Sequence, residues 1–98
     1  MENVIIYYLQ EQSESANNAI NFLKSLIEEL KNYYIIKGVF IDSFNSQTEF
    51  MEMIQSPLSE IDYLLINKLP YDDFNKQLII GLSNSENFKI KLFSEIQI

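Results

Sequence analysis

The chain has 98 residues, and its fourteen acidic residues against seven basic ones give a net charge of −7. That length is typical of one domain, and no apolar run approaches the ~20 residues that a membrane span needs. The acidic balance disfavours direct nucleic-acid binding, which requires Lys and Arg on one face, and favours a basic protein partner. Without Cys or His the usual metal ligands are missing, and the N-terminus lacks the pattern of a signal peptide. We therefore expect no metal, no cofactor and a cytoplasmic location.

The first half of the chain alternates two predicted strands with a helix. Val4–Leu9 is β-branched and aromatic on both faces, as in a covered parallel strand. Residues 16–30 carry apolar side chains at three–four spacing, which predicts a helix capped by Ser13 or Ser15. A second strand is predicted at 33–41, where Gly38 indicates a bulge or a close backbone approach.

The second half repeats the alternation. After a loop at 42–46 we expect a short helix at 48–54 and a buried strand at 61–67. Pro70 suits the first position of a helix predicted over 71–82, with Asp72 and Asp73 in its first turn. The apolar positions of this helix are Phe74, Leu78, Ile79 and Leu82. A turn at 83–87 and an edge strand at 88–93 follow.

This order of elements predicts an α/β domain. Strands and helices alternate with short connections from the first strand to the fourth. Such a pattern is typical of a mainly parallel four-stranded sheet with flanking helices, in three layers. We expect one domain over residues 1–98 and no separate DNA-binding domain.

Four segments together resemble a known family. They are Ile5–Gln12, Val39–Asp42, Ile61–Leu69 and Phe88–Ser94. In order and spacing they are similar to the N-terminal catalytic domain of serine recombinases, the resolvase and invertase group. In that family the first strand ends in Tyr-x-Arg-x-Ser, whose serine attacks a DNA phosphodiester, and a later strand enters Lys-Leu-Asp-Arg-Leu-x-Arg. The resemblance implies a resolvase-like fold over nearly the whole chain.

The chain departs from that family at the motif positions. If Tyr8 is aligned on the motif tyrosine, neutral amides stand at the arginine and serine positions, and one serine lies just past them. In the second motif Lys-Leu is kept, but proline replaces the acid and two aromatic residues replace the arginines. The positions equivalent to family functional residues are Gln10, Gln12, Ser13, Asp42, Lys68, Tyr71 and Phe74.

These departures bear on the chemistry that the resemblance implies. Phosphodiester cleavage requires cationic stabilisation of the transition state, and neutral amide or aromatic side chains cannot supply it. We therefore predict no catalytic residues, and a chain that is not an enzyme but a non-catalytic protein-interaction module. It would bind a recombinase or another nucleic-acid enzyme, or form a homodimer. The predicted surface comprises Asp72, Asp73, Phe88, Lys89, Ile90 and Lys91.

Other functions are also compatible with the residues. The chain could be an acidic inhibitor from a phage or other mobile element that mimics DNA and blocks a nucleic-acid-binding protein. Asp42, Asp72 and Asp73 could hold a divalent cation, although first-turn acids more often only complement the helix dipole. Ser13 could be a nucleophile rather than a helix cap. The six tyrosines could stack on bases, or lie partly buried at the edges of the sheet.

Overall fold

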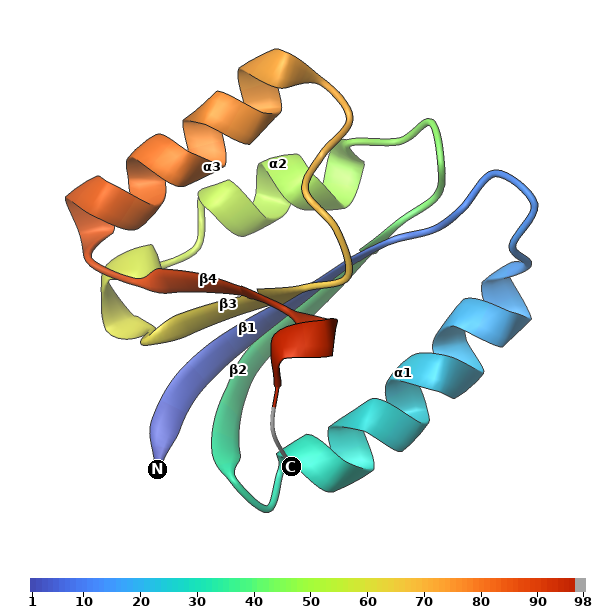
Figure 1. The fold of residues 1–98 in the computed structure, drawn as a ribbon, viewed down its shortest axis with the longest axis horizontal. Helices are drawn as coiled ribbons and strands as arrows, with labels where there is room; N and C mark the ends of the chain where they lie inside the picture. The colour runs from blue at the N-terminus through green and yellow to red at the C-terminus, as the bar shows by residue number, and fades with distance from the viewer. Residues whose placement is uncertain (97–98) are drawn as a thin grey trace.

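Four strands form one sheet in the order β2-β1-β3-β4, in a computed structural model that describes residues 1–96 (Figure 1). Every neighbouring pair is parallel. The strands are β1 (Glu2–Leu9), β2 (Tyr34–Asp42), β3 (Tyr63–Ile66) and β4 (Lys89–Leu92). The predicted parallel α/β sheet is therefore confirmed, with strand ends that differ by one or two residues.

The helices cover both faces of this sheet, which makes the domain three-layered (Figure 1). Helix α1 (Ala16–Leu30) lies on one face together with the short 3₁₀ turn η2 (Phe93–Glu95). Helices α2 (Thr48–Ile54) and α3 (Asp73–Glu86) lie side by side on the other, and a second 3₁₀ turn, η1 (Leu58–Glu60), precedes β3. The bounds of α1 and α2 are those that their apolar spacing predicts.

The centre of the sheet is β1, and its position explains its composition. Because successive side chains of a strand point to opposite faces, a strand covered on both sides must be apolar throughout. Val4, Ile6 and Tyr8 pack under α1. Ile5 and Tyr7 belong to the core beneath α2 and α3.

The irregularity expected at Gly38 is present. The register between β1 and β2 shifts there, because Val4 pairs with Ile36 whereas Ile5 pairs with Gly38. Lys37 is the extra residue, and it is exposed. A Cβ atom at Gly38 would lie 3.0 Å from a ring carbon of Phe40, so the close approach favours glycine at this position.

Helix α3 differs from its prediction at both ends. Pro70 is not its first residue, because Asp72 is the N-cap and the helix begins at Asp73. The expected turn at 83–87 is also wrong, since the helix continues to Glu86. It ends where Asn87 adopts a left-handed conformation (φ 63°), which Asn tolerates better than most residues.

The predicted apolar stripe of α3 is confirmed at Ile79 and Leu82, which face the core, and differs at the start of the helix. Asn75 and Ile79 are the buried residues of the helix, and the side chain of Phe74 is 73% exposed instead of facing inward. Adjacent helical residues point about 100° apart, so a stripe that begins at Asn75 leaves Phe74 outside the core.

Candidate functional site

The carboxyl ends of β1, β2 and β3 meet at one edge of the sheet, where ligands usually bind in open α/β folds. The chain leaves the strands here at Gln10, at Asp42 and at Asn67. The N–H group of Gln10 donates to the carbonyl oxygen of Asp42 at 2.9 Å, which holds the first two exits together. This carboxyl edge is the candidate site.

Asp42 is the most highly connected side chain of the edge. It is 2% exposed, and its carboxylate accepts hydrogen bonds from the Tyr7 hydroxyl (2.7 Å) and the backbone N–H groups of Glu49 and Phe50 (both 2.9 Å). The N-cap residue of α2, Gln47, makes no side-chain capping bond. Asp42 therefore caps α2 from the neighbouring strand, a structural task that accounts for its burial.

Two tyrosines at the end of β1 are bonded to carboxylates. Burial, followed by the hydrogen bond to Asp42 and the charge of that residue, raises the pKa of Tyr7 well above its ordinary value. The hydroxyl of Tyr8 donates to Glu14 at 2.5 Å, and burial with this hydrogen bond raises the pKa of Tyr8 to about 12. Both hydroxyls therefore remain protonated at neutral pH and serve as donors.

Asn67 extends the pairing of β1 with β3 beyond the last strand residue. Its amide oxygen accepts from the N–H of Leu9 at 2.9 Å, and its amide nitrogen donates to the carbonyl of Leu9 at 2.8 Å. One side chain thus satisfies both backbone groups of a buried residue where the backbone of β3 has turned away. Sequence reasoning gave this residue no role, although a polar residue directly after an apolar strand was a visible signal.

Lys68 is the cation that stands at the carboxyl edge, and its charge is compensated. Its Nζ contacts Glu11 Oε1 at 2.5 Å, hydrogen-bonds to the hydroxyl of Tyr71, and lies 4.7 Å from the centre of that ring. Desolvation lowers the pKa of Lys68, but the bonds to Glu11 and Tyr71 outweigh it and leave that pKa raised. The hydrogen bond and charge of Lys68 in turn lower the pKa of Glu11.

Two further motif positions, Gln12 and Ser13, lie in the loop that follows β1. Gln12 and Ser13 are both exposed. Ser15, not Ser13, caps α1, and its hydroxyl accepts from the N–H of Asn18 at 3.1 Å. Ser13 therefore has no capping role.

The start of α3 carries the other predicted positions. The side chain of Asp72 accepts from the N–H of Asn75 at 3.0 Å and caps the helix, whereas Asp73 stands in its first turn. Tyr71 and Phe74 are 54% and 73% exposed. Within residues 1–96 no three acidic side chains gather closely enough to hold a metal ion, because Asp42 and Asp72 cap different helices.

The predicted surface on β4 needs one correction. Phe88 is 3% exposed and belongs to the core beneath α3, so it cannot contact a partner. Lys89 is exposed, and Ile90 is partly buried against the same core. The Nζ of Lys91 lies 4.4 Å from the centre of the Tyr63 ring on the other face of the sheet.

Comparison with known proteins supports the fold. A scan against protein-family models and a search of curated proteins found no match to the chain. Among solved structures, the chain is similar to the C-terminal catalytic domain of ISC1926 TnpA, an IS607-like serine recombinase. The TM-score is 0.67 at 18% identity, over 96% of this chain and 71% of that one. The chain has the fold of a serine recombinase catalytic domain.

This likeness corrects one expectation. The prediction that the chain is not an enzyme is contradicted, because the recombinase-like fold is that of a domain named as catalytic in the solved neighbour. The prediction depended on neutral side chains at Gln10, Tyr71 and Phe74. Neutral side chains at these positions affect the charge at the edge of the sheet, but they do not exclude that a domain with this fold is catalytic. The catalytic domain of the neighbour is C-terminal in its own protein, whereas the family motifs quoted above belong to N-terminal catalytic domains.

All seven basic residues of the recombinase-like domain are lysines, so the chain contains no arginine. Its carboxyl edge combines aromatic rings, amides and carboxylates. Among residues 1–96, no helix has both the length and the apolar composition needed to cross a bilayer.

Proposed function

We propose that this recombinase-like domain is a protein-interaction domain that binds a basic, nucleic-acid-processing protein through its carboxyl edge. The contact surface would be centred on Phe44, Tyr71 and Phe74, here called the aromatic patch. The observation that carries the proposal is the exposure of Phe74 and Tyr71, at 73% and 54%. Both residues stand at the edge of the sheet where open α/β folds bind their ligands.

The aromatic patch has the composition of an interface core. Aromatic residues are enriched in such cores, because a large ring buries much apolar area with little loss of rotamer entropy. The rings of Phe44 and Tyr71 pack edge to face with their centres 5.5 Å apart. This contact and the bond from Lys68 to Tyr71 hold the ring in place before a partner arrives.

The charge around the aromatic patch indicates the chemistry of the partner. Asp72 and Asp73 are exposed between Tyr71 and Phe74. The neighbouring cations, Lys68 and Lys76, are paired with Glu11 and with Asp73 respectively. With a net charge of −7, such a surface favours a partner with a positive face, as recombinases and other nucleic-acid enzymes have.

The exposed edge of β4 is a weaker candidate surface. This strand has four residues, and two of them are lysines, Lys89 and Lys91. Short length and lysine side chains are the features by which natural edge strands avoid pairing with another chain. The aromatic patch therefore fits a partner better than strand addition does.

Site-specific photocrosslinking in the organism that encodes the chain tests this proposal. A photoreactive phenylalanine analogue would replace Phe74, and a control chain would carry it at Asn17, which is exposed on α1. We expect covalent adducts from position 74 with one basic nucleic-acid-binding protein, and none of these adducts from position 17. When the chain and its crosslinked partner are purified, Phe74→Ser should weaken the affinity between them at least about tenfold, as the loss of an interface anchor does. The same substitution at Phe22, exposed on α1, should leave it unchanged.

The alternative partners give different results. Adducts only between copies of the chain, with a dimer that Phe74→Ser dissociates in sedimentation, would identify self-association and overturn the proposal. An acidic inhibitor that mimics DNA would compete with nucleic acid, and its affinity would fall steeply with salt. Binding through the aromatic patch should fall less steeply with salt than binding by such a DNA mimic, because buried apolar area supplies part of its free energy and only a few charges take part.

A further inference from the structure

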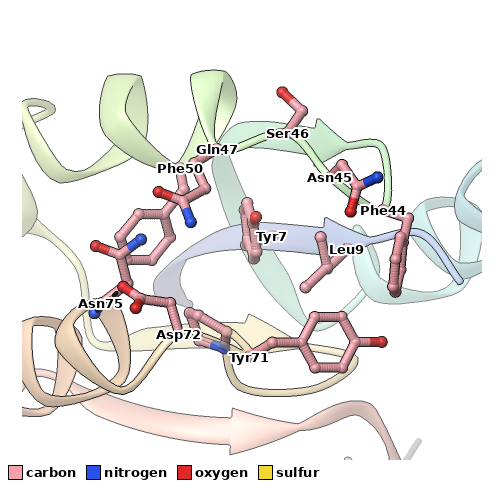
Figure 2. A pocket seen from close by; sticks show the side chains of 11 residues that line it. Tyr7, Leu9, Phe44, Asn45, Ser46, Gln47, Phe50, Tyr71, Asp72 and Asn75 are labelled. Atoms are coloured by element: carbon pink, nitrogen blue, oxygen red, sulfur yellow. Dashed lines mark hydrogen bonds between the residues drawn. The ribbon is translucent and has the colours of Figure 1, made fainter. Parts of the chain in front are cut away.

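A cavity of about 280 Å³ opens at the carboxyl edge beside the aromatic patch (Figure 2). Its walls come from β1, from the loop between β2 and α2, and from the start of α3. Ligand pockets for drug-sized molecules measure roughly 300–1,000 Å³, so this one is of a size for a single side chain. Asn75 and Asp72 lie together on one side of the cavity, and the rings of Phe44 and Tyr71 lie toward its opposite end (Figure 2).

The side-chain amide of Asn75 is buried, but it lacks the hydrogen-bond partner that such amides normally have among residues 1–96. The residue is 4% exposed, and it lines the cavity. Its backbone N–H donates to Asp72, but its side-chain amide makes no hydrogen bond with any of residues 1–96. Every fully enclosed side-chain N or O atom of these residues has a hydrogen-bond partner. The Asn75 amide has none, so it is not fully enclosed and reaches solvent through the cavity. Buried amides are normally bonded within the protein, and a ligand in the cavity would supply the missing partner.

The charge of the cavity selects a cation. Asp72 is the charged residue among those that line it, and no lysine does. One carboxylate oxygen of Asp72, Oδ2, accepts from the backbone of Asn75, whereas Oδ1 accepts nothing from residues 1–96. A negatively charged wall repels a phosphate or carboxylate and attracts a positive group.

The rings of the cavity favour a planar cation over a compact one. Tyr7, Phe44, Phe50 and Tyr71 supply aromatic wall. A guanidinium stacks on such faces and is weakly hydrated, and it carries five N–H donors in a fixed fork. An ammonium is strongly hydrated and makes only point contacts. The Lys68 side chain beside Tyr71 is already neutralised by Glu11, so it does not balance Asp72.

We propose that this cavity binds the guanidinium group of an arginine side chain from the partner protein. The N–H groups would donate to Asp72 Oδ1 and to the amide oxygen of Asn75, and the plane would lie against the aromatic wall. None of the 98 residues can supply the guanidinium, because their basic residues are all lysines, and we assign it to the partner. The inference rests on the proposed function and specifies how the partner is anchored.

Titration of the isotope-labelled chain with small probes, followed by amide chemical shifts, tests the inference. The probes are N-acetyl-arginine methylamide, its neutral isostere N-acetyl-citrulline methylamide, and N-acetyl-lysine methylamide. We expect the arginine probe to shift the signals of Phe44, Asp72 and Asn75 saturably at millimolar concentration. The citrulline and lysine probes should bind at least about tenfold more weakly. No saturable shift with the arginine probe, or equal shifts with citrulline, would overturn the inference.

Two substitutions with a matched control locate the site. Asp72→Asn removes the charge but keeps an equally good N-cap, so α3 should remain intact while arginine binding weakens at least about tenfold. Asp73→Asn removes an acid that does not line the cavity and should leave the affinity for the arginine probe unchanged. Asn75→Leu should weaken arginine binding with the folded spectrum retained. Equal affinity in the wild type and Asp72→Asn would contradict the inference, as would equal losses in Asp72→Asn and Asp73→Asn.

The same variants separate this inference from the function on which it rests. If the crosslinked partner binds the Asp72→Asn chain at wild-type affinity but loses affinity for Phe74→Ser, the interaction surface stands and the arginine anchor is wrong. If the arginine probe binds but no partner is crosslinked at Phe74, the proposed surface is wrong.

Discussion

The hydroxyl of Tyr7 donates a 2.7 Å hydrogen bond to Oδ2 of Asp42, and the same oxygen accepts from the N–H of Phe50 in α2. One buried carboxylate therefore joins the central strand, the end of β2 and the start of a helix. Charged acceptors inside a protein are tolerated where several donors converge on them. This cluster positions the loop that forms one wall of the carboxyl-edge cavity.

Replacing Asp42 by alanine should strongly destabilise the domain. The substitution removes the acceptor of two backbone N–H groups and the Tyr7 hydroxyl, and bonds to a charged group contribute about 1.5–3 kcal/mol each. Because bonds in one cluster are not additive, we expect a loss of about 3–5 kcal/mol in the free energy of unfolding, measured by urea denaturation. Asp73→Ala, at an exposed acid, should change it by less than about 0.5 kcal/mol. A similar small change at Asp42 would refute the capping role.

Asn67→Ala should release the end of β1. The Leu9 N–H and carbonyl would lose their partners at 2.9 and 2.8 Å, at a cost of about 1–3 kcal/mol in unfolding free energy. Hydrogen exchange gives a local readout, since the Leu9 amide should exchange faster relative to amides at the centre of β1. Gln12→Ala, in the exposed loop, is the matched control and should change neither quantity. Unaltered Leu9 exchange in Asn67→Ala would show that the clamp is dispensable.

The stability of the domain should decline in alkaline solution from about pH 10 upward. Tyr8 has a folded pKa of about 12 against an ordinary value of 10.0, so above pH 10 the unfolded chain loses the proton that the folded chain keeps. Its contribution is complete below pH 10 and is lost as the pH rises through about 12. The raised pKa of Tyr7 acts in the same direction.

Tyr8→Phe provides the check on this pH dependence. Without the hydroxyl, the decline of unfolding free energy between pH 10 and 12 should be shallower than in the wild type. The ultraviolet absorbance of tyrosinate should also lose a late-titrating component. The corresponding control is Tyr33→Phe, at an exposed tyrosine, which should keep the wild-type slope. Identical slopes in the wild type and Tyr8→Phe would count against the assigned hydrogen bond.

The two glycines should respond in opposite directions to alanine. Gly81 lies inside α3, and no neighbouring atom comes within 4 Å of the place that a methyl group would take, so Gly81→Ala should stabilise by about 0.5–1 kcal/mol. At Gly38 the methyl group would lie 3.0 Å from the Phe40 ring, and we expect Gly38→Ala to lower the melting temperature. Thermal unfolding of both variants tests the pair; a stabilised Gly38→Ala would show that the ring moves aside freely.

Local pattern was sufficient for much of the fold. The bounds of α1 follow from apolar residues at helical spacing between Ser15 and Lys31. The two-sided apolar run of β1 predicted a covered strand of a parallel sheet, and Gly38 indicated a bulge or a close backbone approach. These features depend on residues near in sequence, where the period of apolar positions and backbone freedom decide the outcome. Spacing also predicted the inward residues Ile79 and Leu82 of α3. It did not predict the start of that helix, because Phe74 and Asn75 are adjacent and only packing against the sheet decides which of them faces inward.

The sequence alone determined the order of strands and helices, the acidic charge and the lack of arginine, because each is a property of composition or of spacing along the chain. The tertiary structure decided the candidate site. Asn67 reaches Leu9 across 58 positions and Tyr7 reaches Asp42 across 35, and no local pattern specifies such pairs. Within residues 1–96, packing leaves the side-chain amide of Asn75 without a hydrogen-bond partner near Asp72 Oδ1, which accepts no hydrogen bond from those residues. This arrangement becomes visible only once β1, the loop after β2 and α3 lie around one cavity.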